Sequence, residues 1–221
     1  MHEVEIARHR SKDVLYFVQA QGRTTILWLN YRNTAEVLKV AFEFAKDVLT
    51  PEDADEDGIP LILPESAERH GPVPELVRLP SFAREVEHVA EEFQRLHADG
   101  VGWGDMAVLY RTGFMGEKVA QRLSAADIPV SMLTGKGKRK DSQSDPNSVK
   151  VVTWHSSKGL EYPIVAIPGL GYLPYERGDE GEEVRLAYVA MTRAMERLVM
   201  TCHRDSPFVE RLVAAGTRYA A

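Results

Sequence analysis

Three arginines are placed where a phosphate-binding group would be expected. Arg32 and Arg111 each follow an apolar, strand-like run, and Arg193 lies in a segment of helical period. The planar guanidinium group offers N–H donors in a fork that matches phosphate oxygens. For Arg193 a second interpretation is a surface arginine whose stem covers Leu186. The spacing alone leaves an anion contact and a plain surface role both open for this residue.

A polar turn, residues 153–161 (TWHSSKGLE), separates two apolar runs. In open parallel sheets ligands bind at the carboxyl ends of strands, so a turn after a strand is a candidate site. His155 can donate a hydrogen bond to a phosphate, although a lone histidine is more often structural. Glu161 can accept a hydrogen bond from a sugar hydroxyl. Tyr31, before a helical segment, can stack on a base, although a single tyrosine there usually packs in the core.

Complete catalytic signatures are missing from the sequence. A phosphate-binding P-loop requires G-x-x-x-x-G-K-[ST] between a strand and a helix, and this pattern does not occur. No apolar strand ends in Asp-Glu, which could hold Mg²⁺, and the G-x-S-x-G, CxxC and HExxH patterns are also missing. The sequence therefore predicts no self-contained hydrolase, metal or redox site.

Composition points to a globular protein of a reducing compartment. Hydrophobic residues make up 44% and charged residues 27% of the 221 positions, and Cys202 is the single cysteine. The first residues are charged, and no apolar run reaches the roughly 18 residues of a membrane span, so we expect neither a signal peptide nor a membrane segment. The formal net charge of −6 means that any nucleic-acid binding must depend on a local basic surface.

Strand-like and helix-like segments alternate along the chain. The expected strands are 25–29, 76–79, 106–110, 130–133, 150–153, 164–167 and 198–202. The expected helices are 35–49, 82–98, 116–126, 182–196 and 206–214, with Asn33 or Thr34 as the cap of the first and Ser81 as the cap of the second. Residues 60–74 are expected to be irregular. Fully apolar strands that alternate with helices predict a parallel sheet covered on both faces.

Several of these segments resemble, in order and spacing, the motifs of the C-terminal motor domain of UvrD/Rep-type superfamily 1 DNA helicases. The resemblance covers roughly residues 26–212. The matching segments are 29–34 (LNYRNT, like NYRST), 107–112 (AVLYRT, like AVLYR), 152–162 (VTWHSSKGLEY, like TxHxxKGLEF), 187–194 (AYVAMTRA, like YVAxTRA) and 206–209 (SPFV). The two motifs at 152–162 and 187–194 are together highly specific.

The resemblance implies a RecA-like α/β fold of the P-loop NTPase type, without a P-loop of its own. ATP and Mg²⁺ would be held mainly by a separate N-terminal P-loop motor domain, across a cleft. Tyr31 would stack on adenine, Glu161 would hold the ribose beside Gly159, and Arg32 and Arg193 would act as catalytic arginines at the γ-phosphate.

The same resemblance implies a surface for single-stranded DNA. It would include Arg111, Thr153, His155 and Lys158. The turn 153–161 would then touch DNA at one end and nucleotide at the other. The parent reaction would be ATP-driven movement along DNA, in the 3′–5′ direction, in the cytoplasm and in association with the nucleoid.

Domain organisation follows from the same comparison. We expect an N-terminal segment at 1–24 and the motor domain at 25–221. The chain would be a fragment of a larger helicase, and this fragment would be inactive as an ATPase by itself. A Lys-rich loop at 135–148 stands where many family members insert a large accessory domain, either as a flexible connection or as a phosphate contact. Two alternatives stay open: the half-motor of a helicase–nuclease repair complex, and a non-catalytic module that binds DNA or protein.

Overall fold

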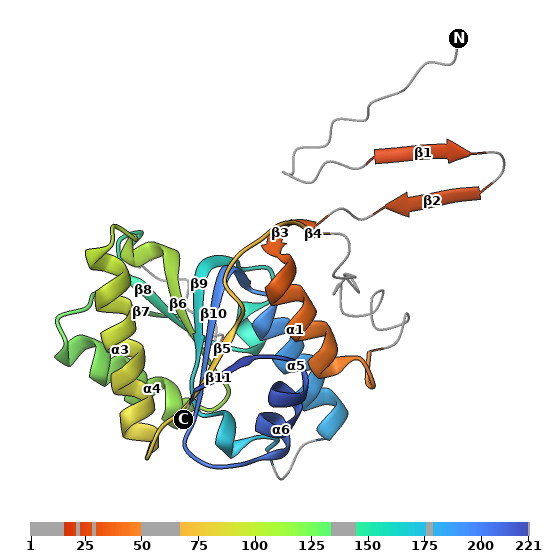
Figure 1. Cartoon of the computed structure of the whole chain (residues 1–221). Coiled ribbons are helices and arrows are strands. Elements are labelled where there is room, and N and C mark those ends of the chain that lie inside the picture. The colour runs from red at the N-terminus through yellow and green to blue at the C-terminus, as the bar shows by residue number, and fades with distance from the viewer. Residues whose placement is uncertain are drawn as a thin grey trace.

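A computed structural model describes residues 16–20, 23–27, 30–49, 67–133, 145–175 and 179–220. Its centre is a seven-stranded sheet in the order β11-β5-β10-β9-β6-β8-β7, with every neighbouring pair parallel. Helices cover both faces of this sheet (Figure 1). The predicted fold class, a mainly parallel RecA-like sheet between helices, is confirmed.

The sheet strands are short and mostly apolar, because both faces of the sheet are covered. Their bounds are β5 (Glu75–Arg78), β6 (Met106–Tyr110), β7 (Val130–Leu133), β8 (Val149–Thr153), β9 (Tyr162–Ile167), β10 (Ala194–Cys202) and β11 (Arg218–Ala220). Two small sheets stand apart from it. One pairs β1 (Tyr16–Ala20) with β2 (Arg23–Leu27), and the other pairs β3 (Asn30–Thr34) with β4 (Ala67–Arg69).

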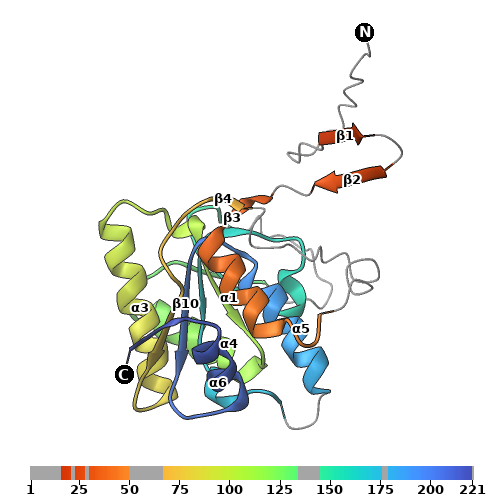
Figure 2. The same ribbon diagram turned by 45° about the vertical axis from the view of Figure 1, so that its right-hand side comes forward.

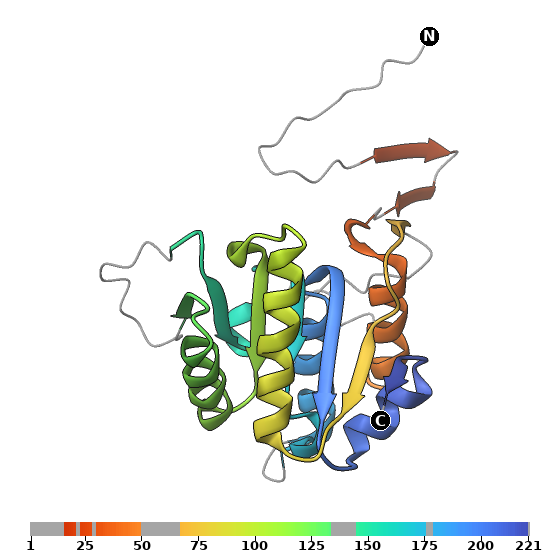
Figure 3. The same ribbon diagram turned by 60° about the vertical axis from the view of Figure 1, so that its left-hand side comes forward.

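Two helical layers bury the two faces of the sheet (Figures 2 and 3). One layer contains α1 (Ala35–Ala45), α5 (Glu180–Met191) and α6 (Pro207–Ala214), and the other contains α3 (Phe82–Ala98) and α4 (Gly113–Ala125). Each layer has its own apolar core. The helical period of the sequence predicts a buried stripe on α3 at Val86, Val89, Ala90, Phe93 and Leu96, and all five are buried. On α1 the same period predicts Phe42 on the buried face, but Phe44 takes the core position.

The common direction of the strands gives the sheet a carboxyl edge and an amino edge. Thr153 ends β8 at the carboxyl edge, and Tyr162 begins β9 at the amino edge. Because both strands run parallel to β6, the connection 154–161 must return along the sheet face from one edge to the other. It does so through a 3₁₀ turn at His155–Ser157 and the buried Trp154. The segment predicted as a turn is therefore a connection that crosses the sheet, and its two ends lie at opposite edges.

Several predicted boundaries are wrong in an informative way. The helix expected at 182–196 ends at Met191, and β10 begins at Ala194, because Ala194 pairs with Tyr162 of β9. Arg193 therefore lies at the junction, so the prediction that it shares a helix face with Leu186 is wrong. Arg32 lies within β3 and does not follow a strand. The stretch 60–74, expected to be irregular, contains β4, and β11 was not expected at all.

Other expectations concern residues outside the described ranges. They are most of the segment 1–24, part of the strand at 25–29 and most of the Lys-rich loop 135–148. Thr34 is the N-cap of α1 as one alternative predicted, but its side chain makes no capping hydrogen bond. Ser81 caps α3 as expected and accepts a hydrogen bond from the backbone N–H of Arg84.

The buried thiol of Cys202 gives a test of this core. Burial raises the pKa of Cys202 to about 11, so very little thiolate exists at pH 8. We expect the native chain to react with a thiol reagent at least ~100-fold more slowly than free cysteine at pH 8, and at the ordinary rate in denaturant. Absorbance-monitored labelling measures both rates. Fast labelling of the native chain would show that this end of β10 is not packed as described.

Candidate functional site

Two segments far apart in the sequence meet at the amino edge of the sheet. Arg32 in β3 donates from Nη1 to Oε1 of Glu161 at 2.7 Å, and the two side chains are 48% and 29% exposed. Glu161 directly precedes β9, so the end of the crossing connection positions it. An exposed ion pair adds little to stability. Both groups are therefore accessible to a ligand at little energetic cost.

Arg193 lies beside this pair, between α5 and β10. Its guanidinium donates from Nε to the Val189 carbonyl at 3.0 Å, from Nη1 to the Leu160 carbonyl at 3.3 Å and from Nη2 to Oγ1 of Thr192 at 3.2 Å. These acceptors are all uncharged. Burial lowers the pKa of Arg193, and the neighbouring Arg32 lowers it further, whereas Glu161 raises it. The guanidinium nevertheless stays charged, as arginines in proteins do.

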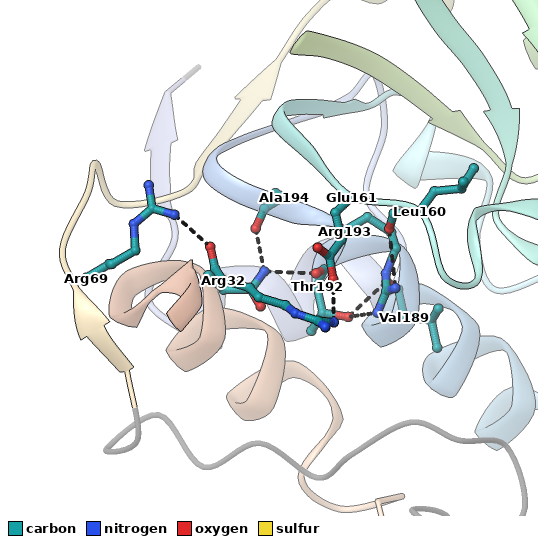
Figure 4. A network of polar contacts seen from close by, with 9 residues as sticks. Arg32, Arg69, Leu160, Glu161, Val189, Thr192, Arg193 and Ala194 are labelled. Carbon is teal, nitrogen blue, oxygen red and sulfur yellow. Dashed lines mark hydrogen bonds and ion pairs between the residues drawn. The ribbon is translucent and has the colours of Figure 1, made fainter. Parts of the chain in front are cut away.

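The backbone around Arg193 is held from both sides. The side chain of Asn33, in β3, donates from Nδ2 to the carbonyls of Thr192 at 2.8 Å and Ala194 at 2.6 Å. The backbone N–H of Tyr162 donates to the Arg193 carbonyl at 3.0 Å. Three consecutive carbonyls thus have fixed partners. Figure 4 shows the polar network around Thr192, Arg193 and Ala194. Asn33 is buried, so its two hydrogen bonds do not compete with water.

A further arginine, Arg69, holds β3 through hydrogen bonds from the neighbouring strand β4. Arg69 in β4 donates from Nη1 to the Arg32 carbonyl at 3.0 Å and from Nη2 to Glu196 at 2.6 Å. Glu196 belongs to β10, so Arg69 links the small β3–β4 sheet to the large one. Figure 4 shows its hydrogen bond to the Arg32 carbonyl. The segment that contains Arg32 is thereby joined to the strand that follows Arg193.

The crossing connection has its own local order. Oγ1 of Thr153 donates to Oγ of Ser156 at 2.9 Å and accepts from the Ser156 backbone N–H at 3.1 Å, which starts the 3₁₀ turn. His155 and Lys158 are exposed on this connection. Gly159 has φ +78°, a conformation that favours glycine. The resulting bend directs the chain toward Glu161.

At the carboxyl edge Arg111 is engaged with α5. Its Nε donates to both carboxylate oxygens of Glu183, at 3.0 and 2.9 Å, and its Nη2 also contacts Oε1. The side chains are 21% and 3% exposed, so the pair is largely buried. The Glu183 carboxylate raises the pKa of Arg111. Tyr110 pairs with Thr153 across the strands, so Arg111 follows directly beside Thr153 at this edge.

An aromatic pocket of about 540 Å³ opens at the same edge, between α4 and the loops after β9 and β10. Its lining includes Phe114, Tyr172, Tyr175 and Arg204, and the guanidinium carbon of Arg204 lies 4.6 Å from the centre of the Tyr172 ring. Beneath it the buried carboxylate of Glu85 accepts hydrogen bonds from Gly169 N–H, Thr201 and His203. This carboxylate fixes the loops that form the pocket.

The structure thus divides the predicted site residues into two groups. Arg32, Glu161 and Arg193 meet at the amino edge, whereas Arg111 and Thr153 lie at the carboxyl edge. His155, Lys158 and Gly159 lie on the connection between the edges. The side chain of Tyr31 is outside the described residues, so its predicted stacking on adenine stays a prediction.

Two positioning residues were missed from the sequence. The sequence predicts Asn33 only as a helix cap and Glu183 only as one residue of a helix. The signal for Asn33 was its place beside Arg32, where the family motif NYRST has serine. Nothing local marked Glu183, because its partner is distant in the sequence.

Neither a metal cluster nor a membrane helix is found in the part of the chain that the structure describes. No group of three or more His, Cys, Asp or Glu side chains there could hold a metal ion. No helix within the same ranges is long and apolar enough to cross a membrane.

Comparison with known proteins identifies related sequences. Residues 131–205 match the family described as UvrD-like helicase C-terminal domain. The ATP-dependent DNA helicase Rep of Escherichia coli (strain K12) is 43% identical over 73 residues, which cover 30% of this chain and 11% of Rep. DNA helicase II of the same organism is 48% identical over 85 residues, with 30% and 12% covered. The chain spans only a small part of these curated relatives.

A solved structure shares the fold. The C-terminal domain of a possible DNA helicase from Lactobacillus plantarum WCFS1 superimposes with a TM-score of 0.58 at 21% sequence identity. The match covers 86% of this chain and 98% of that chain. This likeness extends well beyond the matched residues 131–205 and agrees with the RecA-like architecture.

The hydrogen bonds of Asn33 give a prediction for stability. Asn33→Ala removes the Nδ2 group that donates to the carbonyls of Thr192 and Ala194, at the α5–β10 junction. Because these two carbonyls lose a buried hydrogen bond, we expect the free energy of unfolding to fall by about 2 kcal/mol. Urea titration followed by circular dichroism measures it. The same change at the exposed Asn147 should cost less than about 0.5 kcal/mol. Equal effects at the two sites would contradict the role given to Asn33.

Proposed function

Because residues 131–205 match the UvrD-like helicase C-terminal domain family, we propose that the chain is the C-terminal motor half of an ATP-dependent DNA helicase or translocase. In this proposal residues 25–221 form the motor domain. It offers Arg32 and Arg193 to an ATP molecule that a P-loop motor domain holds. The reaction is the hydrolysis of ATP coupled to movement along single-stranded DNA, in the 3′–5′ direction.

One observation carries the proposal: Arg193 is a part-buried cation whose side-chain hydrogen bonds within the described residues all go to uncharged acceptors. A guanidinium without a direct carboxylate partner is suited to an anion that arrives later. Arg32 is beside it, in an exposed ion pair with Glu161. Two guanidinium groups at one edge match the negative charge that spreads over a transferring phosphoryl group.

The residues present fit the phosphate and ribose of ATP better than its metal. Guanidinium donors suit phosphate oxygens, and the Glu161 carboxylate, once released from Arg32, can accept hydrogen bonds from ribose hydroxyls. Within the described residues no acidic cluster suits Mg²⁺, so the metal and the P-loop contacts would come from the N-terminal motor domain. Tyr31 would stack on the adenine, and Gly159 would let the backbone approach the nucleotide.

The DNA surface in this proposal lies toward the carboxyl edge. Thr153, His155 and Lys158 would contact the single strand, together with Arg111. Exposed His155 and Lys158 offer donors to phosphates, as the sequence-independent part of DNA binding requires. The protein would act in the cytoplasm in association with the nucleoid, where ATP and chromosomal DNA occur together in a bacterium.

A reconstitution tests the proposal. The chain is combined with the P-loop motor domain of its own parent protein, or tested as part of the full-length protein, and ATP hydrolysis is measured with and without single-stranded DNA. We expect DNA-dependent turnover that falls at least ~100-fold with Arg193→Ala, because the arginine stabilises charge in the transition state.

The matched control is Arg84→Ala, on the exposed side of α3, which should leave turnover within about twofold. Absence of turnover in a folded, demonstrated complex would contradict the proposal. DNA binding without any nucleotide dependence would then favour the non-catalytic module.

A further inference from the structure

Helix α5 runs between the two edges of the sheet, and the Arg111–Glu183 ion pair anchors its first turn at the carboxyl edge. Glu183 lies in the first turn of α5, at the carboxyl edge, and Arg193 follows the last turn, at the amino edge. Within the helix Glu183 and Met191 are eight residues apart, or about 12 Å at 1.5 Å per residue. The helix is therefore a direct mechanical link between the predicted DNA surface and the predicted catalytic arginine.

The body of α5 is stiff because it is packed on nearly all sides. From Val184 to Met191 every residue except Arg185 is buried. Such a helix cannot bend locally without opening gaps in a close-packed core. A displacement of its first turn would be transmitted to the α5–β10 junction, where Asn33 holds the carbonyls on both sides of Arg193.

The pair leaves one donor of Arg111 unused. Its hydrogen bonds to Glu183 go through Nε and Nη2, and among the described residues Nη1 has no acceptor. The guanidinium can thus hold the carboxylate and still donate to a phosphate oxygen. Thr153, in the neighbouring strand, marks the same edge.

From these observations we infer that Glu183 is a positioning residue that couples DNA binding to ATP hydrolysis. Arg111 contacts a phosphate of the single strand through Nη1 and pulls on α5 through Glu183, and α5 sets the position of Arg193. The inference rests on the proposed function and deepens it by naming the element that makes hydrolysis depend on DNA.

The test compares ATP turnover with and without single-stranded oligothymidine, in the full-length protein or the reconstituted complex. Glu183→Gln keeps the shape of the side chain and removes the charge that binds Arg111. We expect the ratio of stimulated to unstimulated turnover to fall about tenfold, a typical size for coupling between sites. A purely structural role would lower both rates together and leave the ratio unchanged.

Two comparisons sharpen this experiment. Glu182→Gln is the matched control, since Glu182 is the exposed neighbour on the same turn, and it should keep the wild-type ratio. In an Arg111→Gln background, Glu183→Gln should lower the ratio no further, because both changes break one link. Circular dichroism before and after heating confirms that every variant is folded at the assay temperature.

The outcomes separate this inference from the proposed function. A wild-type ratio in Glu183→Gln, a proportional fall of both rates, or additive effects of the two substitutions would overturn the coupling role while the motor proposal stands. If the wild-type protein shows no DNA-stimulated hydrolysis at all, the proposed function fails first, and this inference fails with it.

Discussion

The single direction of the seven strands decides where every side chain of the site lies. Parallel strands place all their carboxyl ends at one edge, so each connection must cross the sheet to begin the next strand. Most of these connections contain helices, but 154–161 crosses in eight residues without one. Its first residues lie near Thr153 at the carboxyl edge and its last is Glu161 at the amino edge. A motif continuous in the sequence is thereby spread over two separate surfaces.

The amino-edge surface is assembled from main-chain contacts more than from ion pairs. Asn33 and the backbone N–H of Tyr162 fix the carbonyls around Arg193, and the arginine itself binds carbonyls and a hydroxyl. Neutral partners leave the charge of Arg193 uncompensated by any direct carboxylate contact. A carboxylate in their place would compete with an incoming anion. This arrangement resembles a preorganised donor set, which loses little energy to reorganisation when the anion arrives.

Local sequence signals were sufficient where local interactions decide the structure. The strands at 106–110 and 130–133 were predicted with their observed bounds, since apolar runs between polar turns mark buried strands. The buried stripe of α3 followed from its period. The end of α5 could not be found in this way. Residues 192–196 continue a helix-like pattern in the sequence. In the structure, hydrogen bonds from Asn33 and pairing with β9 hold the backbone here in an extended conformation, and both partners are distant in the sequence.

The site shows the same division between residue type and placement. Arg32, Glu161 and Arg193 were recognised by their motifs, and they lie together in the structure. The rule that ligands bind at the carboxyl ends of strands does not locate these three residues, because Glu161 and Arg193 directly precede β9 and β10, and Arg32 lies within β3. Glu183 carried no local signal, because burial and a distant partner give it its role.

The two routes between the edges, the connection 154–161 and helix α5, differ in exposure, and in the proposed function this difference suits them to different tasks. The connection 154–161 exposes His155, Lys158 and Gly159, so these positions can contact a ligand without disturbing the core. Helix α5 is buried from Glu183 to Met191 except at Arg185, and hydrogen bonds hold it at both ends, so we expect it to move as a unit. In the proposed function, the exposed groups of the connection suit contacts with the backbone of a DNA strand whose sequence changes at every step. A rigid helix suits the transfer of a small displacement to Arg193, because a packed core moves between discrete arrangements and does not deform continuously.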